Sequence, residues 1–124
     1  MPISYTYDSD LNLIRTVCEG FVSLRDVLDH FNALQRDSSV GIQANLLLDL
    51  RQQTSVPLIA QLADVTTQME RVARELRFNR CGILADRERV YGVARMFQAM
   101  SSKLFNAVEV FNDPAAAESW LVQQ

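Results

Sequence analysis

A short apolar run at residues 45–50, Asn-Leu-Leu-Leu-Asp-Leu, constrains the fold of this chain more than any other stretch. A run of this length is typical of a strand that is buried on both faces or covered by a helix, and it is too short to be a helix itself. Long helical patterns precede and follow it. A strand between two helices predicts a sheet built from strand–helix units, and therefore an α/β fold.

The amino-terminal part of the chain predicts a hairpin. Residues 3–7 alternate apolar and polar side chains, and residues 11–19 are rich in Leu, Ile, Thr and Val, so both segments are predicted to be strands. The polar turn Asp8-Ser9-Asp10 between them is short enough that the two strands should be antiparallel.

Helical periodicity and short apolar runs supply the remaining elements. Capping or helix-starting residues precede four predicted helices, at Ser23, Pro57, Asp86 and Asp113. Two further strands are predicted over 81–85 and 107–111. The predicted order is β-β-α-β-α-β-α-β-α, a five-stranded, mostly parallel sheet with four helices, because right-handed crossovers make strands two to five parallel.

Composition indicates a single globular domain over residues 1–124. The chain is 48% hydrophobic and 22% charged, as in ordinary soluble proteins. Its net charge of −3 provides no basic surface for nucleic acid. No apolar run approaches the roughly 20 residues that span a bilayer. The first residues also lack the basic and apolar regions of a signal peptide, so we expect a cytoplasmic protein.

No residue pattern indicates a catalytic or metal centre. Cys18 and Cys81 lie in apolar, strand-like stretches and are predicted to be buried, reduced and inert. His30, the single histidine, is predicted to be half-exposed on its helix, with no nucleophile near it in sequence. No glycine-rich phosphate loop is present. We therefore expect no enzyme activity and no cofactor.

Polar residues gather where the parallel strands are predicted to end. The carboxyl ends of such strands meet at one edge of the sheet, so Asp49, Arg51, Ser55 and Asp86 form a candidate polar site. Two interpretations remain open. Either a small polar ligand binds there, or Asp49 pairs with Arg51 while Asp86 caps a helix.

The predicted third helix carries more apolar surface than one contact face requires. One side of the helix is sufficient to face the sheet, and further apolar residues continue around it. Surplus apolar surface marks a contact, and most soluble oligomers are two-fold dimers. We therefore predict a homodimer with a contact formed by Tyr91, Val93, Met96 and Met100. The alternative is that the last helix or Leu104-Phe105 covers the methionines within one subunit.

The element order and several segments resemble the SpoIIAA-like fold of STAS domains, most closely the stand-alone bacterial STAS/SEC14-like branch. The segments that carry the resemblance are Gly20-Phe21-Val22-Ser23, Leu46 to Arg51, Ala94 to Phe97, and Val108 to Phe111 with Ala117 and Trp120-Leu121. None of them is a catalytic motif. The resemblance covers nearly the whole chain and implies that the strands lie in sequential order.

The same resemblance implies a non-enzymatic, regulatory protein-interaction module. The relation to lipid-carrier-like members implies an alternative, the binding of a small apolar or lipid-like ligand. Regulatory members carry a serine that a partner kinase phosphorylates, within an Asp-Ser-Ser-Gly-like segment. Val56-Pro57-Leu58-Ile59 occupies that region here, and Thr54 and Ser55 precede it without the acid before them or the glycine after them. The resemblance therefore does not extend to a phosphorylation switch at Ser55.

Overall fold

The computed structural model describes residues 2–55, 59–86 and 88–123, without the side chains of Ile59, Gln61, Leu62, Val65, Arg89, Val93 and Met100. The elements in chain order are β1 (Ile3–Asp8), β2 (Leu13–Gly20), α1 (Leu24–Arg36), β3 (Asn45–Gln53), α2 (Ile59–Leu76), β4 (Arg80–Leu84), α3 (Glu88–Ser101), β5 (Ala107–Phe111) and α4 (Pro114–Val122). This order confirms the one predicted from the sequence.

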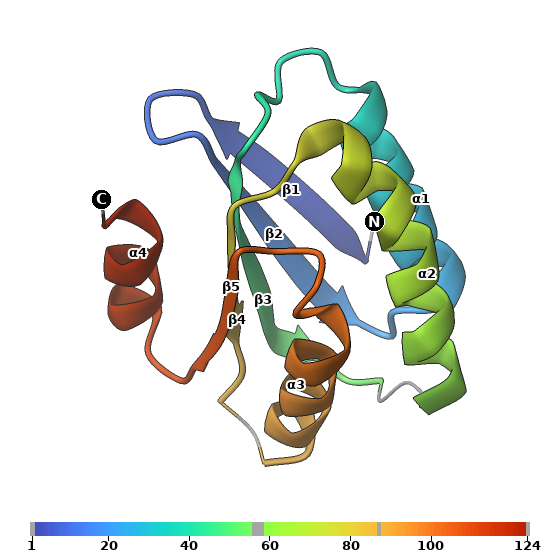
Figure 1. Cartoon of the computed structure of the whole chain (residues 1–124). Coiled ribbons are helices and arrows are strands. Elements are labelled where there is room, and N and C mark those ends of the chain that lie inside the picture. The colour runs from blue at the N-terminus through green and yellow to red at the C-terminus, as the bar shows by residue number, and fades with distance from the viewer. Residues whose placement is uncertain (1, 56–58, 87, 124) are drawn as a thin grey trace.

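The five strands lie in the sheet in the same order as in the chain, β1-β2-β3-β4-β5. β1 is antiparallel to β2, and each later pair of neighbours is parallel. The predicted α/β fold, with an antiparallel hairpin and a mostly parallel sheet, is therefore confirmed (Figure 1). Because the strand order never reverses, the sheet lacks the crevice at which doubly wound proteins bind ligands.

Helices cover both faces of the sheet, but unequally. α1, α2 and α3 pack side by side on one face, and α4 lies alone on the other (Figure 1). The larger core fills the space beneath the three helices, with Leu46 and Ile83 among its fully buried members. A smaller core of Leu13, Leu47, Leu84, Ala117 and Leu121 lies beneath α4.

Gly82 allows α4 to lie close to the sheet. A Cβ atom at this position of β4 would lie 3.2 Å from Cδ1 of Leu121. This separation is closer than ordinary van der Waals contact, so an alanine at this position would require the Leu121 side chain to shift by a few tenths of an ångström. The smaller core depends on this close approach, because α4 is the helix that covers it.

Two of the predicted helix caps are present. Ser23 and Asp26 form a reciprocal capping box at α1, in which the Asp26 N–H donates to Ser23 Oγ (3.1 Å) and the Ser23 N–H donates to Asp26 Oδ2 (2.9 Å). Asp113 caps α4 ahead of Pro114. The predicted helix start at Pro57 lies outside the described residues. The described part of α3 begins at Glu88. Arg87, where the sequence predicted the start of this helix, lies outside the described residues.

His30 is buried, so its interpretation as a half-exposed residue was wrong. Only 7% of it is accessible, and its Nε2 lies 3.1 Å from Thr16 Oγ1 on β2. The ring also packs at an angle against the rings of Tyr5 and Phe31. Burial lowers the pKa of His30 to about 4, so the imidazole is neutral at pH 7. Thr16 supplies the polar partner that makes its burial tolerable.

Both cysteines are buried and free, as predicted. Burial is the main cause that raises the pKa of Cys18 to about 12, with a smaller effect from the charge of Asp49. Burial also raises the pKa of the Cys81 thiol. Both groups therefore remain protonated thiols, which are poor nucleophiles.

Within the described part of the chain, no helix is both long and apolar enough to cross a membrane.

Candidate functional site

The carboxyl ends of the parallel strands bring together three of the four residues of the predicted polar site. Arg51 donates to both carboxylate oxygens of Asp49, from Nε (3.0 Å) and from Nη2 (2.8 Å). The hydrogen bond to Asp49 is the main cause that raises the pKa of Arg51, and the charge of Asp86 makes a smaller contribution, so Asp86 lies within electrostatic range of the pair. Burial alone would raise the pKa of Asp49, but the hydrogen bonds and charge of Arg51 outweigh it and hold that pKa below its usual range.

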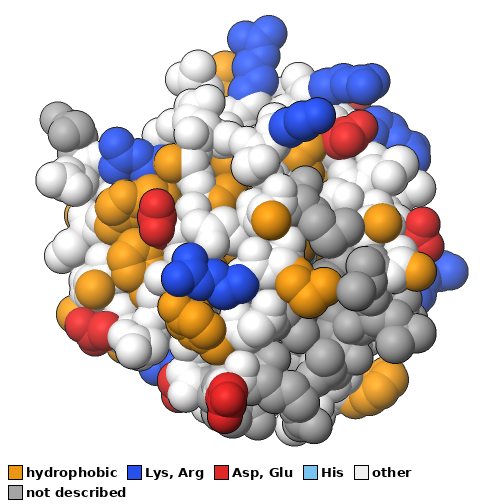
Figure 2. Space-filling view, turned by 60° about the horizontal axis from the view of Figure 1, so that its bottom comes forward, with side chains coloured by type: hydrophobic (Ala, Val, Ile, Leu, Met, Phe, Trp, Pro, Cys, Tyr) orange, Lys and Arg blue, Asp and Glu red, His pale blue; other side chains and the backbone are white. Residues whose placement is uncertain are grey.

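Ser55, the fourth residue of the predicted polar site, joins two backbone segments. Its Oγ accepts from the Val22 N–H and donates to the Val22 carbonyl, both at 2.9 Å. Figure 2 looks onto this end of the molecule, where side chains of both charges are interspersed with apolar ones. The contacts of Asp49, Arg51 and Ser55 favour the structural interpretation of these residues, and a ligand at this edge stays a prediction.

The predicted contact on α3 is partly used within the chain. Met96 is half-buried and packs against the larger core. Tyr91 is also half-buried, and the guanidinium of Arg95 lies 5.4 Å from the centre of its ring. The side chains of Val93 and Met100 lie outside the described residues. The last helix, α4, lies on the opposite face of the sheet, so the alternative that it covers the methionines was wrong. Met96 instead packs against the larger core, which includes Phe105.

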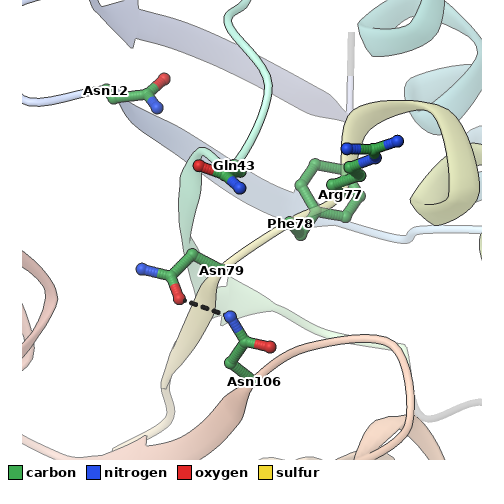
Figure 3. Close-up of a pocket in the computed structure, with 6 residues that line it drawn as sticks. All are labelled: Asn12, Gln43, Arg77, Phe78, Asn79 and Asn106. Carbon is green, nitrogen blue, oxygen red and sulfur yellow. Dashed lines mark hydrogen bonds between the residues drawn. The ribbon is translucent and has the colours of Figure 1, made fainter.

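Two adjoining cavities lie at the opposite edge of the sheet, where the parallel strands begin. They measure about 470 and 410 Å³ and share Asn12, Gln43 and Asn79. We refer to them together as the amino-end groove. Its polar lining is formed by Asp10, Asn12, Gln43, Asn45, Arg77, Asn79, Arg80, Asn106 and Gln123. Figure 3 shows the first cavity, with Gln43 between Asn12 and the pair formed by Asn79 and Asn106.

An asparagine marks the start of every parallel strand. Asn12 precedes β2, Asn45 begins β3, Asn79 precedes β4 and Asn106 precedes β5. Because the strand order is sequential, these residues form a row across one edge of the sheet. Main-chain hydrogen bonds extend the ladder into this row, from the Asn45 N–H to the Asn12 carbonyl (3.0 Å) and from the Asn106 N–H to the Asn79 carbonyl (2.7 Å).

Part of the row is occupied with holding the fold together. Asn12 Oδ1 accepts from the Tyr7 hydroxyl (2.6 Å), and Asn12 Nδ2 donates to the Ile42 carbonyl (3.0 Å). Asn45 Oδ1 accepts from the Arg80 N–H (2.9 Å) and Asn45 Nδ2 donates to the Leu121 carbonyl. These two carboxamides are therefore structural.

Other polar groups in the groove have hydrogen-bonding capacity to spare. Asn106 Nδ2 donates to Asn79 Oδ1 (2.8 Å), which leaves Asn79 Nδ2 and Asn106 Oδ1 without partners among the described residues. The side chains of Gln43 and Arg77 make no hydrogen bond or ion pair to any residue that the structure describes. These four residues lie around the first cavity, so their spare groups are available to a ligand.

The backbone is strained at the same place. Within residues 2–55, 59–86 and 88–123, three non-glycine residues have a positive φ: Asn12 (51°), Gln43 (63°) and Arg77 (52°). All three line the first cavity. Asparagine tolerates this conformation, but glutamine and arginine adopt it at a cost of roughly 1–2 kcal/mol. Strained residues of this kind cluster at ligand-binding sites.

Local structure explains the conformations but not the residue types. Arg77 follows α2 at the position where a left-handed glycine commonly ends a helix, and its N–H donates to the Ala73 carbonyl (2.7 Å). The Gln43 N–H donates to the Leu76 carbonyl (2.8 Å). Gly41 fixes the same loop, because its N–H donates to the Tyr7 hydroxyl (3.0 Å). The fold thus requires a left-handed backbone conformation at positions 43 and 77. Nothing in the fold requires the side chains at these positions to be glutamine and arginine.

Sequence reasoning missed the amino-end groove, although the sequence carried a signal for it. The signal is the asparagine that precedes or begins each predicted strand after the first hairpin turn. The positive φ values of Gln43 and Arg77 had no such signal, because neither residue is a glycine.

No protein-family model and no curated protein matches the sequence. Among solved structures, the chain is similar to an uncharacterised protein of the DUF3478 family with a SpoIIAA-like fold, from Shewanella loihica PV-4. The two share 13% sequence identity over 96% of this chain and 93% of that one, with a TM-score of 0.61. At this identity the likeness concerns the fold alone. Together with the strand order, it identifies this chain as a domain with the SpoIIAA-like fold.

Proposed function

We propose that this chain is a non-enzymatic, regulatory protein-interaction module that binds its partner at the amino-end groove. One observation carries the proposal: Gln43 and Arg77 occupy strained backbone positions beside the groove, and their side chains make no hydrogen bond to the described residues. A residue whose backbone conformation costs stability, and whose exposed side chain makes no hydrogen bond to the described residues, is accounted for when a partner uses that side chain.

The chemistry of the titratable groups supports a role without catalysis. His30 is neutral and surrounded by the larger core, and the two thiols are held in their protonated form. Asp49 is engaged by Arg51. A general base needs a pKa near the working pH and access to substrate, and none of these groups combines the two.

The alternative of a small apolar or lipid-like ligand receives no support from the amino-end groove. Carboxamide and guanidinium groups dominate its lining. A site for an apolar ligand is lined mainly by hydrophobic and aromatic side chains. The polar lining is better matched to a partner that offers hydrogen-bonding groups.

Photo-crosslinking in the native host tests the proposal. A benzophenone amino acid replaces Ile42, which is 57% exposed and adjoins Gln43. We expect one discrete adduct, reduced by Gln43→Gly. This variant should not lower the unfolding midpoint, because glycine relieves the strained φ. The same crosslinker at the exposed Asn32 of α1 is the control. No adduct from position 42, or the same adduct from position 32, would contradict the proposal.

We also propose that the module is a cytoplasmic homodimer that associates through α3. The support is the apolar surface of this helix, to which the half-buried Tyr91 and Met96 contribute. Light scattering after gel filtration should give the mass of a dimer at tens of micromolar. Met96→Glu should give a folded monomer, whereas Ala116→Glu, on the exposed side of α4, should leave the dimer intact. A wild-type monomer would refute the homodimer.

A further inference from the structure

The first cavity of the amino-end groove is positively charged. Arg77 is its one ionisable lining residue among those described, and the remaining lining consists of carboxamides and Phe78. The carboxyl end of α2 is adjacent and carries roughly half a negative charge. The whole positive charge of Arg77 exceeds it. The second cavity differs, because it includes Asp10, and its Arg80 already donates to the carbonyls of Trp120 (2.9 Å) and Gln123 (3.0 Å).

The spare groups around the first cavity match a particular chemistry. Arg77 presents a guanidinium fork, which pairs with the two oxygens of a carboxylate. Gln43 presents a donor and an acceptor side by side, the arrangement that complements one peptide group. Asn79 Nδ2 adds a donor and Asn106 Oδ1 adds an acceptor. One carboxylate and one or two peptide groups would use all of them.

Apolar side chains stand at the border of this polar lining. Leu11 is 44% exposed, Ile42 is 57% exposed and Val122 is 43% exposed. Leu11 and Val122 line the second cavity, and Ile42 directly precedes Gln43. Exposed apolar residues that border a polar groove favour a ligand with its own apolar side chains over a bare anion.

From these observations we infer that the amino-end groove binds the carboxyl-terminal end of a partner polypeptide. Arg77 pairs with the terminal carboxylate, Gln43 and the Asn79–Asn106 pair bond the last peptide groups, and the apolar border contacts the side chains. This inference rests on the proposed function, because it names the part of the partner that the same groove recognises.

A titration followed by nuclear magnetic resonance tests the inference on the full chain. The probe is N-acetyl-Ala-Ala-Ala with a free carboxylate, added to ¹⁵N-labelled protein at pH 7. We expect the side-chain NH₂ signals of Gln43 and Asn79 to shift, with a dissociation constant on the order of 1 mM. The same peptide with an amidated carboxyl end should bind about fivefold more weakly, because charged hydrogen bonds are stronger than neutral ones.

Two matched variants assign the carboxylate to its partner. Arg77→Gln should bring the affinity for the acid peptide down to that for the amide. Arg74→Gln removes the same charge from the exposed side of α2, outside the lining of either cavity, and should preserve the difference. Glutamine adopts the positive φ at position 77 at about the same energetic cost as arginine. Both variants should therefore fold alike.

Acetate and inorganic phosphate, added separately, distinguish a peptide site from a general anion site. Equal shifts with either anion would overturn the inference, as would equal affinity for the acid and amide peptides. No shift with any probe up to roughly 20 mM would also overturn it. If the titration shows no peptide binding but crosslinking at position 42 still gives a discrete adduct, the groove binds a partner in some other way. Only the inference about the carboxyl-terminal end is then refuted. If the titration shows no binding and the crosslinking gives no adduct, the proposed function is refuted as well.

Discussion

Leu46→Ala should lower the free energy of unfolding by about 2–5 kcal/mol, a large share of the roughly 5–15 kcal/mol that stabilises a domain. Leu46 is fully buried in the larger core, and its strand position lies between Ile14 on β2 and Cys81 on β4. Removing three methylene-sized groups there leaves a cavity that the three covering helices cannot fill. Urea denaturation, with the slope checked for two-state behaviour, measures the loss.

Leu48→Ala is the matched control on the same face of the same strand. Leu48 packs against the larger core but is only half-buried, so its truncation should cost less than that of Leu46. The sequence predicted that either Leu47 or Leu48 would be the fully buried residue facing a helix layer. The expectation is confirmed for Leu47, which is buried beneath α4. On the opposite face of β3, Leu46 is the fully buried residue and Leu48 is only half-buried. A loss below about 1 kcal/mol for Leu46→Ala would contradict the core described above.

Acidification from pH 6.5 to 4 should destabilise the protein by about 3 kcal/mol through His30 alone. Its pKa is about 4 in the folded chain against 6.5 for the free group. The unfolded chain therefore binds a proton first, and stability falls as pH drops through this window. Carboxylates with lowered pKa, such as Asp26, Asp37 and Asp49, lose their contribution mainly below their ordinary value of 3.8.

The double variant Thr16→Val with His30→Phe isolates this effect. It removes the buried imidazole together with the hydroxyl group that faces it, so no polar atom of the pair is left unsatisfied. Its unfolding free energy should be nearly constant between pH 6.5 and 4.5, whereas that of the wild type should fall. If both proteins lose the same stability over this range, His30 is not the group responsible.

The sequence was sufficient for the fold because the relevant signals are local. The Asp8-Ser9-Asp10 turn, the Ser23 and Asp113 caps and the apolar runs each specify their own element, and the helical crossovers make the later strands parallel. The sequential order of the strands was implied by the resemblance to the SpoIIAA-like fold. His30 could not be placed in this way. Its burial depends on Thr16, which lies 14 residues earlier and on another element.

The amino-end groove required the strand order and the backbone conformation together. Each asparagine of the row, taken alone, is an ordinary turn or loop residue. They become one surface only when four parallel strands begin at a common edge in sequential order. The left-handed conformations of Gln43 and Arg77 arise from the end of α2 and the loop before β3, so they follow from the packing of two elements and not from residue type.

The sequential strand order also has a consequence for folding during synthesis. Each strand pairs only with its neighbours in the chain, so the sheet can grow by one strand at a time as the polypeptide emerges from the ribosome. The face of the sheet that α4 covers is the last to be completed, because α4 is the last element of the described chain. Until α4 is made, Leu13, Leu47 and Leu84 have no covering helix, and the nascent sheet presents an apolar surface to other chains. Aggregation during synthesis should therefore depend on how quickly α4 docks against Gly82.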